Sequence, residues 1–280
     1  MKELDYYYSA LYQQSTSIEF FRYFLLLSTI LCLSYSIFAH GYYLYAAAIT
    51  AVIFQISSWF LKTKVENIRS IANEFQKISI LTKAYGKVPS EFQLSHLKAQ
   101  VNARVSRKVE IKIKENKKGS EYNLKKKETS TDILTSMIHE NSYWNHHLYK
   151  IIFIFIITFI SSIFVLLLVT ALFAIPLIKS DPDYSIPRLA FTFLSFSLVY
   201  EVLENAIKSY KSSRAMLEID NELSREAKTT DEKLLKLFNQ YCEFKEKAPN
   251  VPSFIYNANR QRLNSGWNSR METIHIKSKA

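Results

Sequence analysis

Glycine, cysteine and recognisable catalytic motifs are scarce in this 280-residue sequence. The four glycines are isolated from one another, at Gly41, Gly86, Gly119 and Gly266. A phosphate-binding loop of the Walker or dinucleotide type needs closely spaced glycines, so neither type is present. The two cysteines, Cys32 and Cys242, cannot form a metal site between them, and we expect them to be packing residues in a reducing compartment.

The histidines do not supply the missing chemistry. His139 and His146 are seven residues apart and would share one helical face, but no third ligand has a suitable spacing for zinc. The pair His139-Glu140 lacks the following histidine of a metalloprotease helix, and no serine lies in a nucleophile elbow. We therefore predict no catalytic residue, no metal and no cofactor, and a function other than that of an enzyme.

Four long apolar runs stand out in an otherwise charged sequence. Tyr23–Ala39, Tyr42–Leu61 and Ile151–Ile178 contain no charge over 17, 20 and 28 residues, and a fourth run extends from about Leu189 to Leu203 with its first acid at Glu201. Crossing about 30 Å of hydrocarbon at about 1.5 Å per residue takes about 20 helical residues. The sequence predicts an all-α integral membrane protein with four transmembrane helices.

The spacing of the runs predicts two hairpins. Only His40 and Gly41 separate the first two runs, which also excludes a cleaved signal peptide, and a short polar turn ending at Pro187 joins the last two. The expected division is a first hairpin with its preceding segment, a soluble segment, a second hairpin, and C-terminal helices with a tail. These parts are 1–61, 62–150, 151–207 and 208–280.

The basic residues predict the orientation of the spans. The segment from Lys62 to Lys150 carries 18 Lys and Arg against 9 acids, and the stretch after Tyr200 carries 14 against 11, whereas the two short turns carry few. Basic loops stay on the cytoplasmic side. We expect a multi-pass protein with both termini and the central segment in the cytoplasm.

The soluble portion is expected to be mainly helical. One exception is the alternation of Val109, Ile111 and Ile113 with charged residues, which has the period of a strand and suggests a small β-hairpin near 109–124. The tail after Trp267 shows no periodicity and is expected to be disordered.

Three polar residues at the end of the fourth run share one helical face. Glu201, Glu204 and Asn205 are spaced i, i+3 and i+4, in the last turn that the bilayer would cover. A ring of such carboxylates in an oligomer would line the mouth of a pore. Alternatively, both acids extend into the headgroups, with Glu204 paired to Lys208. The basic surplus fits contact with membrane lipids, and no DNA-recognition motif is present.

Two segments resemble a known family. Asn141-Ser142-Tyr143-Trp144-Asn145 lies just before the third span, and a Pro-x-x-Pro-x-x-Ile-Tyr pattern followed by arginine spans Pro249–Arg260. Together with the layout of the spans, these segments are similar to the SMODS-associated four-transmembrane pore-forming effectors of bacterial anti-phage (CBASS) systems. The resemblance implies a homo-oligomer of the bacterial inner membrane. A cyclic nucleotide or cyclic oligonucleotide would activate it to permeabilise the membrane and arrest growth.

The matched residues suit a nucleotide. Trp144 and Tyr256 offer stacking faces, Arg260 and Arg262 offer forked donors for phosphate, and Asn141 can bind a base edge. In a purely structural alternative, Trp144 anchors the interface and Tyr256 packs within the soluble portion. Two rival functions stay open: a constitutive ion channel or transporter, and a membrane receptor or scaffold that conducts nothing.

Overall fold

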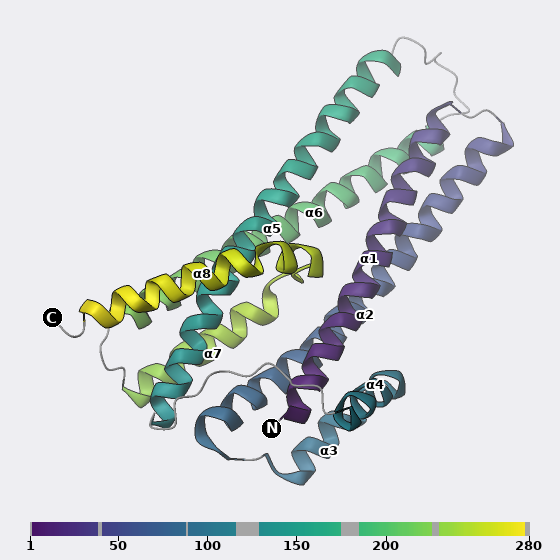
Figure 1. Cartoon of the computed structure of the whole chain (residues 1–280). Helices are drawn as coiled ribbons and strands as arrows, with labels where there is room; N and C mark the ends of the chain where they lie inside the picture. The colour runs from purple at the N-terminus through teal and green to yellow at the C-terminus, as the bar shows by residue number, and fades with distance from the viewer. Residues whose placement is uncertain are drawn as a thin grey trace. The chain divides into compact units, whose positions relative to one another are not determined.

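The computed structural model describes residues 2–38, 41–87, 89–115, 129–174, 185–225 and 230–277 (Figure 1). These residues form α-helices joined by short connections, and no strand occurs among them. The helices are α1 (Lys2–Phe38), α2 (Tyr42–Tyr85), α3 (Glu91–Ala99), α4 (Ala103–Lys114), α5 (Ser130–Ala174), α6 (Ser185–Arg225), α7 (Asp231–Lys247) and α8 (Ser253–Lys277). The prediction of an all-α protein is confirmed for the described part of the chain.

Local sequence signals set several helix ends. Ser90 and Gln93 form a capping box at the start of α3, each side chain accepting a hydrogen bond from the other's backbone N–H. Asn102 caps α4. Helix α2 ends at Gly86, which has φ +67° and donates its N–H to the Thr82 carbonyl over 2.9 Å. Glycine adopts this left-handed conformation at no steric cost.

Three helices in the described residues are long and apolar enough to cross a membrane, as in a membrane protein. They comprise Glu3–Ser36, Tyr42–Tyr85 and Ser130–Ser162. The sequence predicts four. Its fourth run lies within α6, which is a continuous helix, but the side chains of residues 185–198 lie outside the described set, so that span stays a prediction. The turn at 179–184 lies outside it as well.

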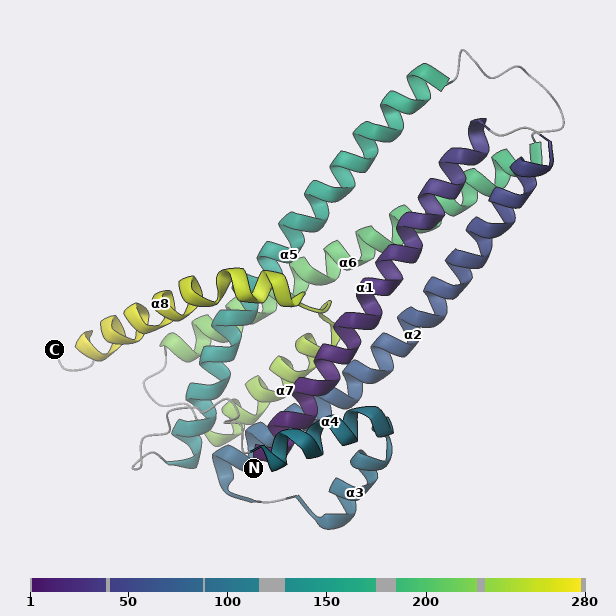
Figure 2. The same cartoon turned by 45° about the vertical axis from the view of Figure 1, so that its right-hand side comes forward.

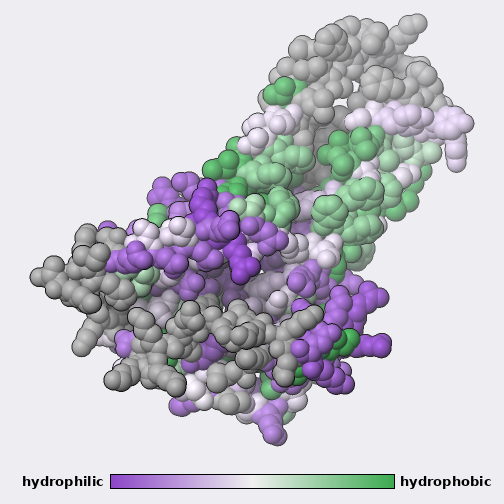
Figure 3. Space-filling model, viewed as in Figure 1, coloured by the Kyte–Doolittle hydropathy of each residue, from purple (hydrophilic) through white to green (hydrophobic). Residues whose placement is uncertain are grey.

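The chain divides into two compact units. Unit 1 comprises 1–16, 66–151 and 208–280, and unit 2 comprises 17–65 and 152–207. In unit 2 a small contact between Leu33 and Ala51 is buried, while large apolar side chains such as Phe24 and Trp59 are exposed. Figure 3 shows hydrophobic residues gathered over the unit 2 segments of α1 and α2. An apolar surface of this kind is stable in contact with hydrocarbon rather than water.

Unit 1 has a core of the kind found in water-soluble domains. The start of α1 packs on α2 and α4 (Figure 2). The Tyr7 and Phe75 rings stack there with their centroids 4.9 Å apart. Helices α5, α6 and α7 contribute further fully buried side chains. These include Leu134, Ile138, Met216, Ile219, Leu234, Leu237, Phe238 and Tyr241.

The predicted β-hairpin is wrong where the structure describes it. Val109, Ile111 and Ile113 belong to helix α4. Val105 and Val109, four residues apart, are the buried residues of that helix, whereas Ile111 and Ile113 are exposed. Burial therefore follows the four-residue spacing of a helix, and the short alternation of apolar and charged residues does not predict which side chains are buried. Residues 116–124 lie outside the described part.

The expected disorder after Trp267 is also wrong, because α8 continues to Lys277. Arg270 holds this last part of α8 by donating from Nη1 to Asp220 Oδ2 and from Nη2 to Ser224 Oγ, each over 2.7 Å. A single ion-pair contact of this kind leaves no periodic signal in the sequence.

Candidate functional site

The structure brings two of the predicted ligand residues together in unit 1. Trp144 on α5 and Tyr256 on α8 have ring centroids 5.7 Å apart, with an angle of 34° between the planes. Tyr256 lies in the first turn of α8, where its N–H bonds to the Pro252 carbonyl over 3.1 Å, and 39% of it is exposed. The indole Nε1 of Trp144 is buried and has no hydrogen-bond partner within the part of the chain that the structure describes. A buried donor without a partner is uncommon in folded proteins, and a ligand acceptor would satisfy it.

The other three predicted ligand residues surround this pair less closely. Asn141 donates its side-chain amide to the Met137 carbonyl of its own helix over 2.8 Å. Arg260 and Arg262 are exposed on α8 and form no ion pair within the described residues. Their guanidinium groups are therefore available to a solvent-borne anion, but among the described residues neither arginine contacts the Trp144–Tyr256 pair.

The beginning of the segment Pro249–Arg260, which resembles the effector family, has a packing role. Pro249 and Asn250 are buried, and Asn250 donates to Ser15 Oγ on α1 over 3.3 Å. Arg69 on α2 donates to the Ala248 carbonyl at the end of α7. These contacts position the start of α8, and hence Tyr256, without exposing the two residues to a ligand.

A close approach fixes α8 against α5. Gly266 lies so near Tyr143 that a Cβ at this position would stand 2.5 Å from the phenolic oxygen. The Tyr143 ring also contacts Trp267 at 5.5 Å and His147 at 4.7 Å, and the Arg270 guanidinium lies 5.5 Å from it. The glycine thus permits an aromatic contact at Tyr143, the α5 residue directly before Trp144 of the predicted ligand pair.

A polar cluster that no sequence pattern predicts joins α5, α6 and α8. Asp220 is buried and pairs with His139 Nε2 at 3.1 Å and with Arg270 at 2.7 Å. Ser224 Oγ lies 3.0 Å from the same His139 nitrogen. A catalytic triad needs the serine and the acid on opposite ring nitrogens, so this cluster is not arranged as a triad. The described residues contain no group of three or more His, Cys, Asp or Glu side chains placed to bind a metal.

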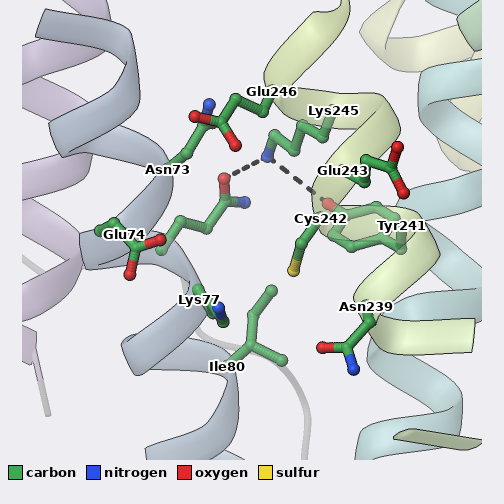
Figure 4. A pocket seen from close by; sticks show the side chains of 11 residues that line it. Asn73, Glu74, Lys77, Ile80, Asn239, Tyr241, Cys242, Glu243, Lys245 and Glu246 are labelled. Atoms are coloured by element: carbon green, nitrogen blue, oxygen red, sulfur yellow. Dashed lines mark hydrogen bonds between the residues drawn. The ribbon is translucent and has the colours of Figure 1, made fainter. Parts of the chain in front are cut away.

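A polar cavity of about 220 Å³ lies between α2 and α7 within unit 1. Figure 4 shows Lys245 and Cys242 of α7 pointing toward α2. Lys245 Nζ donates to Gln76 Oε1 and, over 3.4 Å, to the Tyr241 hydroxyl. The rest of the lining is mostly polar: Asn73, Glu74, Lys77, Ile80, Asn239, Glu243 and Glu246.

Lys245 has no acidic partner among the described residues. Its contacts within the described residues are neutral oxygens and the faces of Tyr12 and Tyr241, at 5.5 and 5.7 Å. Burial, with a contribution from the Arg69 charge, lowers the pKa of Lys245 to about 7. Burial also raises the pKa of Cys242 to about 11, which keeps this thiol protonated and unreactive at neutral pH.

The predicted pore residues lie in unit 2, and the structure gives each acid a cationic partner in the same chain. Glu201 pairs with Arg22 of α1 at 2.7 Å, and Glu204 pairs with Lys62 of α2 at 3.1 Å. Asn205 lies half-buried in the same turn of α6. Neither cation is predictable from the spacing on α6, because both come from other helices.

No protein-family model matches the chain, and no curated protein and no solved structure is detectably similar to it.

Proposed function

We propose that the chain is a ligand-gated effector of bacterial anti-phage defence that acts on the inner membrane. A cyclic nucleotide or cyclic oligonucleotide binds unit 1, a homo-oligomer opens a pore or disrupts the bilayer, and growth of the infected cell stops. No bond is made or broken in this process, so it needs no catalytic residue and no cofactor.

The observation that carries this proposal is the contact between Trp144 of α5 and Tyr256 of α8. Stacking on aromatic faces binds any nucleobase, and the unpartnered indole N–H adds a directed donor. Helix α5 continues without a break from Ser130 to Ala174, so the residue that would contact a base belongs to the same helix as the third apolar run. A ligand that changes the position of α8 on α5 therefore acts directly on a membrane helix.

The proposed topology has four spans in two hairpins, with the fourth over Leu189–Leu203. Both termini and the central segment face the cytoplasm, where the second messenger is made. The basic surplus of these segments contacts anionic lipid headgroups rather than DNA. Exposed Arg260 and Arg262 supply the phosphate contacts.

The test uses purified protein in liposomes that contain a self-quenched dye. Cyclic di-AMP, cyclic di-GMP and the mixed cyclic AMP–GMP dinucleotide are added in turn, and dye release is followed. Release should depend on one of these nucleotides. Trp144→Ala and Tyr256→Ala should each weaken the response by about ten- to hundredfold, because one stacking face contributes about 1–3 kcal/mol.

Phe92→Ala is the matched control, since Phe92 is an aromatic residue of unit 1 that is 80% exposed and distant from α5 and α8 in sequence. Release that needs no nucleotide would favour a constitutive channel. Nucleotide binding without release of dye or ions would favour a receptor or scaffold. An unchanged response in both alanine variants would place the ligand site elsewhere.

A further inference from the structure

Four charged side chains of unit 2 lie at matching ends of the apolar runs. Arg22 directly precedes the first run, Lys62 directly follows the second, and Glu201 and Glu204 end the fourth. Charges at such positions border the hydrocarbon, where each one is costly unless it meets water, headgroups or an opposite charge. The structure shows that these four meet one another.

The acids of α6 are tied to two different helices. Arg22 Nη2 on α1 lies 2.7 Å from Glu201 Oε1, with the two side chains only 3% and 14% exposed. Lys62 Nζ on α2 lies 3.1 Å from Glu204 Oε2, with 22% and 32% exposure. One pair is thus enclosed and the other borders solvent, and together they attach one turn of α6 to both helices of the first hairpin.

The enclosed Arg22–Glu201 pair is better suited to be exchanged between two arrangements than to stabilise one of them. An arginine does not lose its proton in a protein, so buried Arg22 needs a negative partner. Among the described residues, Arg22 Nε and Glu201 Oε1 nevertheless make no well-aligned hydrogen bond, and the guanidinium lies 5.0 Å from the Tyr23 ring. A buried ion pair with incomplete hydrogen bonding contributes little net stability, although removal of one partner is strongly unfavourable. Such a contact can be exchanged for another at low cost.

We propose that Arg22 and Lys62 are the gating residues of unit 2, which hold the Glu201–Glu204 face of α6 neutral in the resting protein and release it on activation. This inference rests on the proposed function, because it names the part of the membrane unit on which the ligand signal acts. While both pairs are closed, α6 cannot rotate that face away from the first hairpin. Once they separate, repetition of the face around an oligomer axis creates a negative mouth that concentrates cations.

The experiment measures dye release and cation-to-anion permeability from liposomes without any nucleotide. Arg22→Gln and Glu201→Gln each leave one buried charge without a partner. Each should raise the ligand-free release by on the order of tenfold or more, because the charge left without a partner is enclosed in the resting arrangement and destabilises it. The double variant R22Q/E201Q removes both charges, and the exchange R22E/E201R restores an opposite-charge contact. Both should return release toward the wild-type level.

Lys233→Gln is the matched control, because Lys233 forms an exposed 3.7 Å pair with Glu222 between α7 and α6 in unit 1. It should leave ligand-free release unchanged. Thermal unfolding in detergent confirms that each variant is folded. If Arg22→Gln and Glu201→Gln are folded and release dye only as the wild type does, with unchanged permeability ratios, the gating role is wrong. If no protein, wild type included, releases dye even after the cyclic dinucleotides are added, the proposed function fails as well.

Discussion

Replacement of Gly266 by alanine tests the packing of α8 on α5, on which the ligand site depends. Two opposing effects decide whether this substitution stabilises or destabilises the protein. Alanine stabilises a helix interior by about 1 kcal/mol relative to glycine. The new Cβ would lie 2.5 Å from the Tyr143 hydroxyl oxygen, closer than van der Waals contact allows, and 3.7 Å from Cζ, which is an ordinary contact. Overpacking of this kind costs about 1–3 kcal/mol.

The Tyr143 ring cannot move away freely, because His147, Trp267 and Arg270 contact it. We therefore expect Gly266→Ala to destabilise unit 1 by about 1 kcal/mol net in the wild-type background. In a Tyr143→Phe background the clashing oxygen is gone and only the helix-propensity gain remains. There, the same substitution should stabilise the protein by up to about 1 kcal/mol.

The assay is thermal unfolding in mild detergent, followed by tryptophan fluorescence, for the four proteins of the double-mutant cycle. For a soluble part of this size, about 1 kcal/mol corresponds to roughly 2–4 °C in Tm. Ser265→Ala, one residue away and exposed, is the control and should shift Tm by no more than about 1 °C. Equal effects of Gly266→Ala in both backgrounds would refute the contact between α8 and α5.

Three further predictions concern other parts of the chain. The pKa of Lys245 is about 7 in the folded protein and about 10.4 in an unfolded chain, so the unfolded chain binds more protons above pH 7. The Tm should therefore rise from pH 7 to 8.5, and Lys245→Met should flatten that rise. Val109→Ala should lower the unfolding free energy by about 2 kcal/mol and Ile111→Ala by about 0.5, a difference that a strand would not produce. In a background without native cysteines, Tyr42→Cys should react with an impermeant thiol reagent on intact cells, and Ser265→Cys only after lysis; the reverse pattern would overturn the orientation.

Periodicity and composition predict the helices of this protein well and its side-chain contacts poorly. The three apolar helices follow from uninterrupted runs such as Tyr42–Leu61, because backbone hydrogen bonds inside hydrocarbon leave few alternatives to a helix. The segment at Val109 was assigned wrongly because three alternating residues cannot distinguish a strand from a helix with two buried positions. Tertiary packing, not local pattern, decides such cases.

The candidate site was predictable only in part, for the same reason. Their residue types make Trp144 and Tyr256 candidates for stacking, but nothing in their 112-residue separation predicts that the rings meet. Likewise, Arg22 is one of many basic residues in the sequence, and only the fold reveals that it faces Glu201. Charges that pair across helices carry no periodic signal.

The length and composition of α2 and α5 have a consequence for tolerance to insertion. Each exceeds 40 residues and contains neither glycine nor proline, the residues at which helices most often kink. A single residue inserted near Lys150 would turn everything beyond it by about 100° about the helix axis and advance it by about 1.5 Å. Residues on either side of such a position therefore keep a fixed angle to one another about the helix axis, whereas the connections that flank α3 fix no such angle. Natural or engineered length changes should be confined to those connections, with whole-turn insertions the least damaging within the long helices.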